Sequence, residues 1–210
     1  TGPNTGGMGA YCPTPLVDVD LLTMIEQDIL LPTVDALRRE GIDYRGVLYA
    51  GLMLTPAGPK VLEFNCRFGD PECQPLMTRL RGDLLEILWA TCAGRLHEID
   101  FNFSSEAACC VVMCSGGYPG SYAKGRVITG LEDVASDSDL VVFHAGTVKG
   151  EDGSIQTAGG RVLGVTALGP DLATARDRAN AACERISFDG ATWRKDIGHR
   201  VLSATSTRKT

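Results

Sequence analysis

Two apolar segments on either side of a Pro-Gly turn place the strongest constraint on how the first half of this chain folds. Residues 46–54 form a continuous run of apolar and small residues, which is typical of a buried strand. Residues 55–58 (Thr-Pro-Ala-Gly) have the composition of a turn, and residues 60–65 return as a second strand. Together they predict an antiparallel hairpin.

A helical pattern precedes this hairpin. Asp18 or Asp20 is the candidate N-cap, and the apolar residues that follow recur at spacings of three and four. We expect Pro32 to kink or split this helix, and a second helical piece to stop at Gly41. The apolar positions of the first piece are Leu22, Ile25 and Ile29.

A second helical pattern follows the hairpin. Leucines recur every four residues, which predicts one amphipathic helix that ends near Gly94. These leucines are Leu76, Leu80, Leu84 and Leu88.

The second half of the chain reads as strands followed by one helix. Apolar runs predict strands at 107–113, 140–145 and 162–168, with a turn at 151–153 between the last two. Asp171 is the expected cap of a helix that packs through small residues. The layout is α+β, with two antiparallel sheets carrying helices. We expect one domain over residues 1–104, a second over 105–202, and a flexible tail at 203–210.

Composition narrows the class of protein. The 210 residues carry a formal net charge of −6, which argues against binding nucleic acid through bulk charge. The sequence has no apolar run long enough to span a membrane and no signal-peptide pattern, so we expect a cytoplasmic protein. Glycine is abundant, at 25 residues, which predicts tight turns or close approaches of the backbone to a ligand.

The eight cysteines favour reduced thiols over a disulfide scaffold or a zinc site. No Cys-x-x-Cys pair occurs and the three histidines are far apart. Five of the cysteines lie in apolar or periodic stretches, where we expect them to be buried. These are Cys66, Cys109, Cys110, Cys114 and Cys183.

The most informative polar motif is Glu63-Phe64-Asn65-Cys66-Arg67. Alternate residues of a strand share a face, so Glu63 and Asn65 would present two oxygen ligands side by side, with Phe64 turned into the core. A carboxylate and an amide oxygen suit Mg²⁺, and Arg67 would share their face if the strand continues. A solvated strand face with an incidental Glu and Arg is the alternative.

Three weaker motifs accompany it. Asp70-Pro71-Glu72 reads as the capped start of a helix that can also form an anion pocket. The glycines around Met8 could cradle an anion, although such clusters are more often plain turns. Arg161 follows two glycines at a strand entrance and either faces a phosphate or lies on the surface. His144 is expected to pack at the end of a strand.

Taken together, these segments resemble phosphoribosylamine–glycine ligase, an ATP-grasp ligase of purine biosynthesis. The block from Gly58 to Glu72 carries the resemblance most clearly, and it extends over nearly the whole chain apart from the tail. The other matching segments are residues 2–11, 46–54, 124–125, 144–147, 159–163 and 194–198.

The resemblance implies the second half of an ATP-grasp domain followed by a small α/β C-terminal domain with antiparallel strands. It implies that ATP phosphorylates glycine and that phosphoribosylamine attacks the acyl phosphate, with Mg²⁺ or Mn²⁺ bridging the nucleotide phosphates. Glu63 and Asn65 match the metal ligands, and Arg67 would neutralise the transferring phosphoryl group as the catalytic residue. Substrate-binding residues would be Thr5, Gly6, Gly7, Met8, Gly9, Asp70 and Arg161.

The family enzyme is about twice as long as this chain, so we expect the N-terminal half of the enzyme to lie upstream of Thr1. Three alternatives stay open: a ligase, a non-catalytic module that binds a phosphate ligand or a partner, or the ligase portion of a multifunctional purine-synthesis protein. The expected partners are the small-molecule substrates, the missing half or fused domains, and neither nucleic acid nor a membrane. Half of an ATP-grasp should also leave a sheet edge and an apolar face uncovered.

Overall fold

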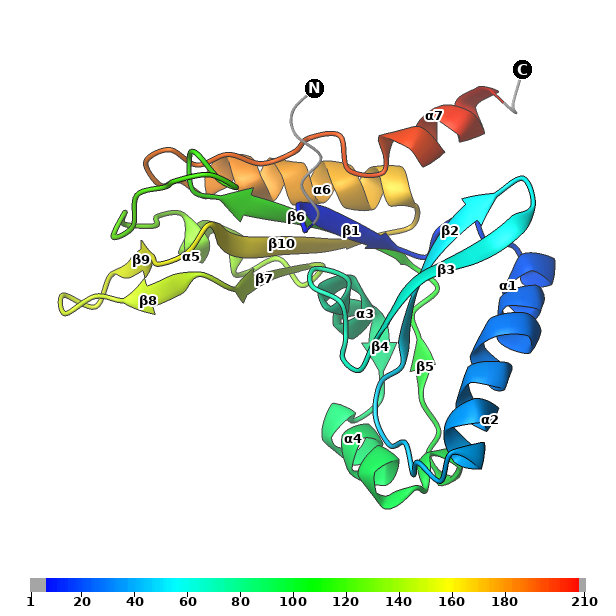
Figure 1. Cartoon of the computed structure of the whole chain (residues 1–210). Helices are drawn as coiled ribbons and strands as arrows, with labels where there is room; N and C mark the ends of the chain where they lie inside the picture. The colour runs from blue at the N-terminus through cyan, green and yellow to red at the C-terminus, as the bar shows by residue number, and fades with distance from the viewer. Residues whose placement is uncertain (1–6, 208–210) are drawn as a thin grey trace. The chain divides into compact units, whose positions relative to one another are not determined.

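The computed structural model describes residues 7–207 and confirms the α+β class (Figure 1). The chain forms two compact units, each assembled from separate segments. The described part of the first unit comprises residues 7–13, 70–80 and 103–207, and the second comprises 14–69 and 81–102. The predicted linear division at residue 104 differs from these interleaved units and stays a prediction about domains.

A four-stranded antiparallel sheet forms the centre of the first unit, in the order β1-β6-β10-β7. It confirms the three strands predicted in the second half of the chain. The glycine-rich segment adds a strand that the sequence analysis did not predict. The four strands are β1 (Gly9–Cys12), β6 (Ala107–Cys114), β7 (Leu140–His144) and β10 (Arg161–Gly169).

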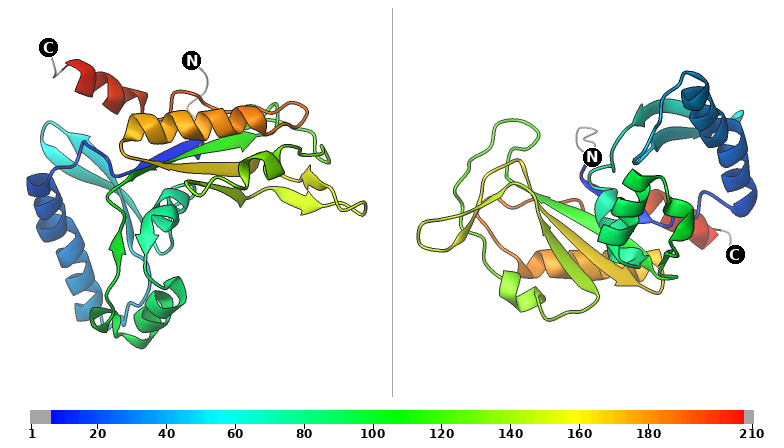
Figure 2. Two further views of the ribbon diagram at one scale, coloured as in Figure 1. Left: turned by 180° about the vertical axis from the view of Figure 1, so that it is seen from behind. Right: turned by 90° about the horizontal axis from the view of Figure 1, so that it is seen from below.

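Helix α6 (Leu172–Arg185) covers one face of this sheet, as both views of Figure 2 show. The odd-numbered residues of β6 lie in the same buried cluster as the small residues of α6. The even-numbered residues Cys110, Val112 and Cys114 belong to a second cluster with Met8 and Tyr118. Because β6 is fully buried on both faces, the core of the molecule lies along this strand.

The remaining elements of the first unit are short. The strands β8 (Thr147–Lys149) and β9 (Ile155–Thr157) flank the predicted turn at 151–153. Helix α3 (Cys73–Arg79) contacts β6 and β10, and α5 (Leu131–Val134) contacts α6. Helix α7 (His199–Thr207) runs into the segment predicted as a flexible tail, so residues 203–207 are helical.

The second unit contains the predicted hairpin, formed by β2 (Tyr49–Thr55) and β3 (Gly58–Asn65). A nearly continuous helix precedes it. It consists of α1 (Val19–Ile25), the π-helical turn η1 (Glu26–Leu30) and α2 (Leu31–Arg39). Asp18 caps α1 by accepting a hydrogen bond from Leu21 N at 2.9 Å.

The sequence analysis expected Pro32 to kink or split this helix, but the structure shows no split there. Pro32 lies near the start of α2, directly after η1. The wider π-helical turn gives room where the proline ring would otherwise press on the carbonyl four residues earlier. The predicted stop at Gly41 is confirmed, with Gly41 at φ +75° and its N–H bonded to Arg38 O.

The prediction of a single leucine-rich helix after the hairpin is wrong. The segment is interrupted by β4 (Leu80–Arg81), and Gly82 at φ +144° turns the chain before α4 (Leu84–Ala93). Asp83 then caps α4 by accepting from Leu85 N at 2.8 Å. The four-residue spacing continues across the break, so periodicity alone hid it. The remaining elements are η2 (Leu96–Glu98) and β5 (Asn102–Phe103), which pairs with β4.

The second unit has almost no buried core. Ile25 and Ala90 are its only buried hydrophobic residues, and all of its residues are described. The expected burial of β2 and of Phe64 is therefore wrong: Met53 is 51% exposed and Phe64 is 41% exposed. The expectation of an uncovered apolar face is confirmed. None of the helices in the described part of the chain has the length and apolarity to cross a membrane.

The cysteines divide by exposure. Cys109, Cys110, Cys114 and Cys183 are buried as expected, but Cys66 is exposed because β3 ends at Asn65. Burial raises the pKa of Cys109 and of Cys110 to about 12, and it also raises the pKa of Cys183. Core thiols of this kind should be unreactive, because the thiolate is the nucleophile.

Labelling of the native protein with a thiol reagent at pH 8 should modify Cys66 and Cys92 quickly. Mass spectrometry should find Cys109, Cys110 and Cys183 unmodified until the protein is unfolded in urea. A Cys66→Ser variant should lose one of the fast sites. Labelling of any buried cysteine at the rate of Cys66 would contradict the described core.

Replacing Asp171 should destabilise the first unit. Its carboxylate accepts a hydrogen bond from Thr174 N at 2.8 Å and caps α6. We expect Asp171→Ala to lower the free energy of unfolding by about 1 kcal/mol, measured by urea titration. Asp171→Asn is the matched control, because asparagine also caps helices and should retain most of this stability.

Candidate functional site

The predicted pair of oxygen ligands lies on β3. Asn65 Nδ2 donates to Glu63 Oε1 at 3.1 Å, so the two side chains share one face of the strand. Gly51 lies opposite Glu63 on β2, and a Cβ there would come within 3.2 Å of Glu63 Cγ. Because Gly51 has no side chain, the Glu63 side chain has space on this face of the hairpin.

The donor set of this pair fits a hard cation. Because Asn65 donates through its nitrogen, its Oδ1 and the second oxygen of Glu63 are left to face an ion. Residues 7–207 contain no cluster of three or more His, Cys, Asp or Glu residues suited to hold a metal. Mg²⁺ commonly takes one or two protein carboxylates and completes its coordination with water and substrate phosphates. The donor set therefore suits a hard cation such as Mg²⁺.

Arg67 does not continue the face of Glu63 and Asn65, because the strand ends at Asn65. Its side chain is exposed, and Nη1 donates to Phe68 O at 2.9 Å. Nearby, hydrogen bonding to Cys66 raises the pKa of Tyr44, whose hydroxyl also donates to Val47 O at 2.7 Å.

The first unit brings three of the other predicted residues together. Arg161 Nη2 lies 2.7 Å from Asp70 Oδ2, and Nη1 donates to Asp70 O at 3.0 Å and to Gly7 O at 3.4 Å. A Cβ on Gly7 would come within 2.6 Å of Arg161 Nη1, so glycine allows this approach. Asp70 thus provides an internal counter-ion for Arg161.

Asp70 does not cap the following helix, which corrects the sequence analysis. Helix α3 begins at Cys73, after Glu72, and Glu72 makes no side-chain cap. Asp70 Oδ1 accepts from Gln74 Nε2 at 3.3 Å, while its other oxygen faces Arg161. The carboxylate is therefore directed by an ion pair and an amide, and not by the helix N-terminus.

Met8 immediately precedes β1, and Gly9 is the first residue of that strand. Met8 O accepts from Val112 N at 3.1 Å, and Met8 Sδ is 3.5 Å from Cys114 Sγ. A Cβ on Gly9 would lie 2.7 Å from both Cys110 O and Ile197 Cδ1. Thr5 and Gly6, which the resemblance also assigned to the substrate, lie outside the described residues.

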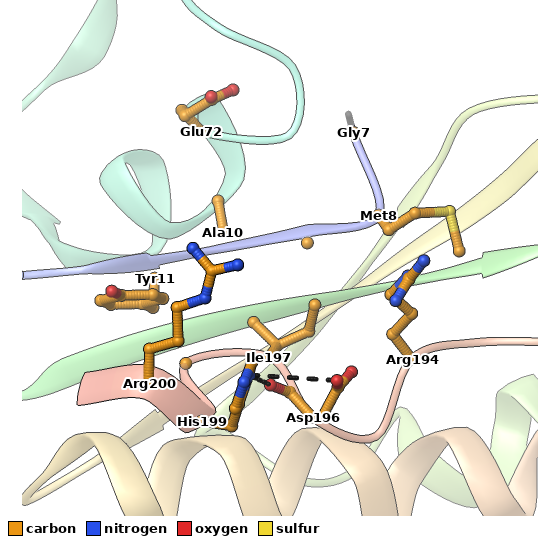
Figure 3. A pocket seen from close by; sticks show the side chains of 12 residues that line it. Gly7, Met8, Ala10, Tyr11, Glu72, Arg194, Asp196, Ile197, His199 and Arg200 are labelled. Carbon is orange, nitrogen blue, oxygen red and sulfur yellow. Dashed lines mark hydrogen bonds and ion pairs between the residues drawn. The ribbon is translucent and has the colours of Figure 1, made fainter. Parts of the chain in front are cut away.

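A hollow of about 520 Å³ adjoins this strand in the first unit (Figure 3). We call it the β1 hollow; residues 7–11, Glu72, Arg194 and 196–200 line it. The sequence analysis missed this feature, although it matched residues 194–198 to the family without assigning them a role. Arg194 and Arg200 lie more than 180 residues after β1 in the sequence, so no local pattern pointed to this hollow.

His144 is exposed, so the expected packing role is wrong. Its Nδ1 is 3.0 Å from Thr147 Oγ1.

Two models of known protein families match this chain. A family model described as phosphoribosylglycinamide synthetase, ATP-grasp (A) domain matches residues 1–73. A second, described as phosphoribosylglycinamide synthetase, C domain, matches residues 108–200. The first match covers the hairpin with Glu63 and Asn65, which places that hairpin in an ATP-grasp domain.

Individual relatives agree with both models. Phosphoribosylamine–glycine ligase of Rhodopirellula baltica is 53% identical over 203 residues, which are 96% of this chain and 46% of that protein. Trifunctional purine biosynthetic protein adenosine-3 of Gallus gallus is 53% identical over 206 residues, covering 98% of this chain and 20% of that protein. The crystal structure of phosphoribosylamine–glycine ligase from Thermotoga maritima has a TM-score of 0.81 at 34% identity, over 93% of this chain and 47% of that chain.

The chain therefore belongs to the phosphoribosylglycinamide synthetase family. It spans about half the length of the phosphoribosylamine–glycine ligases that it matches.

The Arg161–Asp70 pair should show measurable but modest coupling. Asp70 is about half exposed and the Arg161 side chain is 29% exposed, so solvent screens the attraction. A double-mutant cycle of Asp70→Asn and Arg161→Gln, followed by urea unfolding, should give about 0.5–1 kcal/mol. Additive effects of the two single substitutions would show that the ion pair contributes nothing to stability.

Proposed function

We propose that this chain carries part of an ATP-dependent ligase that joins glycine to 5-phosphoribosylamine. The γ-phosphoryl group of ATP passes to the glycine carboxylate, giving glycyl phosphate and ADP. The amine of phosphoribosylamine then attacks the acyl carbon and displaces phosphate, giving glycinamide ribonucleotide. The observation that carries this proposal is the Glu63–Asn65 pair on the hairpin of a matched ATP-grasp domain.

Glu63 and Asn65 would hold Mg²⁺, or Mn²⁺, through the second carboxylate oxygen of Glu63 and Oδ1 of Asn65. When bound, the cation neutralises the nucleotide phosphates and fixes their orientation. The hydrogen bond between the two side chains keeps both oxygens on one face before the ion arrives. Gly51 supports this arrangement from β2, because a side chain there would press against Glu63.

Arg67 would act as the catalytic residue of the phosphoryl step. A guanidinium that faces the transferring group stabilises the charge of the transition state, which is the dominant contribution in such reactions. The support is positional: Arg67 is exposed two residues after Asn65, and its Nη1 donates to Phe68 O.

The residues of the first unit would bind substrate. Gly7, Met8, Gly9, Asp70 and Arg161 were assigned to this role by the family resemblance. Arg161 uses two nitrogens on Asp70 and Gly7, so N–H groups remain for an anion. Asp70, which is half exposed, has lone pairs left for an amine or a hydroxyl.

A non-catalytic module that binds a phosphate ligand is the alternative, and the matches to ligases do not favour it. The Gallus gallus relative is named as a trifunctional purine biosynthetic protein, so we include fusion to further purine-synthesis domains in the proposal about partners. The division into domains at residues 104 and 105, and a cytoplasmic location, also stand as proposals.

Paramagnetic Mn²⁺ with ATP should test the metal pair directly. Titration into ¹⁵N-labelled protein should broaden the amide resonances of residues 63–67, because Mn²⁺ broadens nearby nuclei even when binding is weak. Glu63→Gln should remove this broadening, since the amide lacks the charge that attracts the cation. Glu26→Gln, an exposed acid on η1, is the matched control and should leave the broadening intact.

Broadening that persists in Glu63→Gln would contradict the assignment of the metal site. The reaction itself requires a second assay, in which repeated turnover of ATP to ADP depends on both glycine and phosphoribosylamine. A phosphate ligand that binds while no such turnover occurs, even with the rest of the enzyme present, would favour the non-catalytic alternative.

A further inference from the structure

We propose that Ser115 and Tyr118, on the loop that follows β6, are positioning residues that hold Arg161 against Asp70. All four residues belong to the first unit. The inference rests on the proposed function only in assigning Arg161 to the substrate, because the contacts themselves lie within this unit.

Arg161 needs support from other segments, because strand alternation does not set its direction. The register of β10 against β6 shifts between Arg161 and Leu163, so an extra residue enters β10 there. A bulge of this kind re-aims a side chain and disrupts the local ladder of hydrogen bonds. The guanidinium nevertheless has a defined direction, since Nη2 lies 2.7 Å from Asp70 Oδ2 and Nη1 donates to Asp70 O at 3.0 Å.

Ser115 supplies two of the hydrogen bonds that fix the main chain before Arg161. Its N–H donates to Gly160 O at 2.8 Å, and its hydroxyl donates to Gly159 O at 2.8 Å. Only 3% of Ser115 is exposed, so water does not compete for these bonds. The two carbonyl groups that precede Arg161 are therefore held by one residue at the end of β6.

Tyr118 packs against the same peptide. Gly160 is buried, and a Cβ on it would collide with the ring of Tyr118 and come within 2.9 Å of Tyr122 Cε1. The Tyr118 ring also packs against the buried even-numbered residues of β6, which fix its position. The two tyrosine rings are tilted, with 6.4 Å between their centroids. Close packing of these rings on a glycine restricts rotation of the adjoining peptide groups.

The turn after β7 bonds to the segment from another direction. Gly146 N donates to Arg161 O at 2.9 Å, and a Cβ on Gly146 would lie 2.6 Å from both Arg161 O and Gly159 Cα. The carbonyl groups on both sides of the Arg161 Cα are thus bonded. Glycines at these positions cannot be replaced without a collision, so Ser115 and Tyr118 are the positions at which a substitution can test the arrangement.

The support matters because the Arg161–Asp70 pair is weak by itself. Both side chains are partly exposed, so solvent screens their attraction. Nη1 can reach Asp70 O and Gly7 O only while Nη2 faces the carboxylate. A small rotation of the main chain at Arg161 would therefore weaken all of these contacts together. Side chains that bind a ligand keep their geometry when packing and hydrogen bonds lock the groups behind them.

The test follows the guanidinium of Arg161 by NMR in protein labelled with ¹⁵N-arginine, with Arg161→Lys used to assign its signal. Rotation about the Cζ–Nε bond should be slow in the native chain, because Nη1 and Nη2 have different partners. Tyr118→Ala should speed this rotation by about tenfold, the change expected from losing one charge-assisted hydrogen bond. Tyr118→Phe keeps the ring and should restore the native rate. Ser115→Ala removes one oxygen atom and should speed the rotation by about threefold.

Asp171→Ala is the matched control, because it destabilises the same unit by removing the cap of α6. The rotation of Arg161 in this variant should equal that of the native protein. In the turnover assay with the rest of the enzyme present, Tyr118→Ala should raise the KM for phosphoribosylamine by about tenfold and leave kcat unchanged. A loss of folding alone would reduce the amount of active enzyme and would not change the KM.

Three results would overturn the inference. Native rotation in both Tyr118→Ala and Ser115→Ala would show that the partners of the guanidinium hold Arg161 unaided. Equal acceleration in Asp171→Ala and Tyr118→Ala would show a general loosening of the unit. Equal acceleration in Tyr118→Phe and Tyr118→Ala would assign the effect to the hydroxyl group and not to packing of the ring. Ser115→Ala is the smaller change, and it carries the test if Tyr118→Ala does not fold.

Failure of this inference is distinguishable from failure of the proposed ligase. The Mn²⁺ experiment reports on Glu63 and Asn65 in the second unit, and the rotation of Arg161 reports on the first. Broadening at residues 63–67 with native rotation in Tyr118→Ala and Ser115→Ala would overturn this inference and leave the ligase proposal standing. Faster rotation in Tyr118→Ala with no such broadening would contradict the metal site and leave the positioning of Arg161 standing.

Discussion

The pairing of β6 with a strand on each side is the constraint on which the first unit depends. β6 is buried from Ala107 to Cys114, so its N–H and C=O groups must bond to β1 and β10. This pairing carries the segment after Gly7 to the sheet edge and places Arg161 at the start of β10, next to a register shift. The positions of these candidate ligand-binding groups thus follow from the needs of the core.

The second unit obeys a different constraint. It buries little apolar surface, so the arrangement of Glu63 and Asn65 depends on local backbone pairing with β2. The hydrogen bond between the two side chains and the space at Gly51 are both short-range features. A site organised in this way keeps its local geometry even where tertiary packing contributes little.

Local patterns predicted the parts of the molecule that local physics determines. The turn at residues 55–58 identified the hairpin that contains β3, and strand parity identified the shared face of Glu63 and Asn65. Cap residues identified the starts of α1 and α6. Leucine spacing failed at Gly82, because a helix break leaves the period unchanged when the offset happens to match. The Arg161–Asp70 pair and the β1 hollow join residues more than 90 positions apart, which no local pattern reports. Burial of β2 was overestimated because an apolar run shows what a strand can pack against, and not whether a partner is present.

The packing around Gly9 affects how mutational data on this segment should be interpreted. A methyl group there would press on Cys110 O and on Ile197 at once, and one of the two is main chain that cannot yield. Substitutions at Gly9 should therefore act as folding defects that separate β1 from its neighbours. Under the proposed function, a scan that scores only activity would rank this glycine beside Glu63, although the loss at Gly9 would come from misassembly and the loss at Glu63 from a missing metal ligand. Measuring the amount of folded protein for each variant separates the two causes.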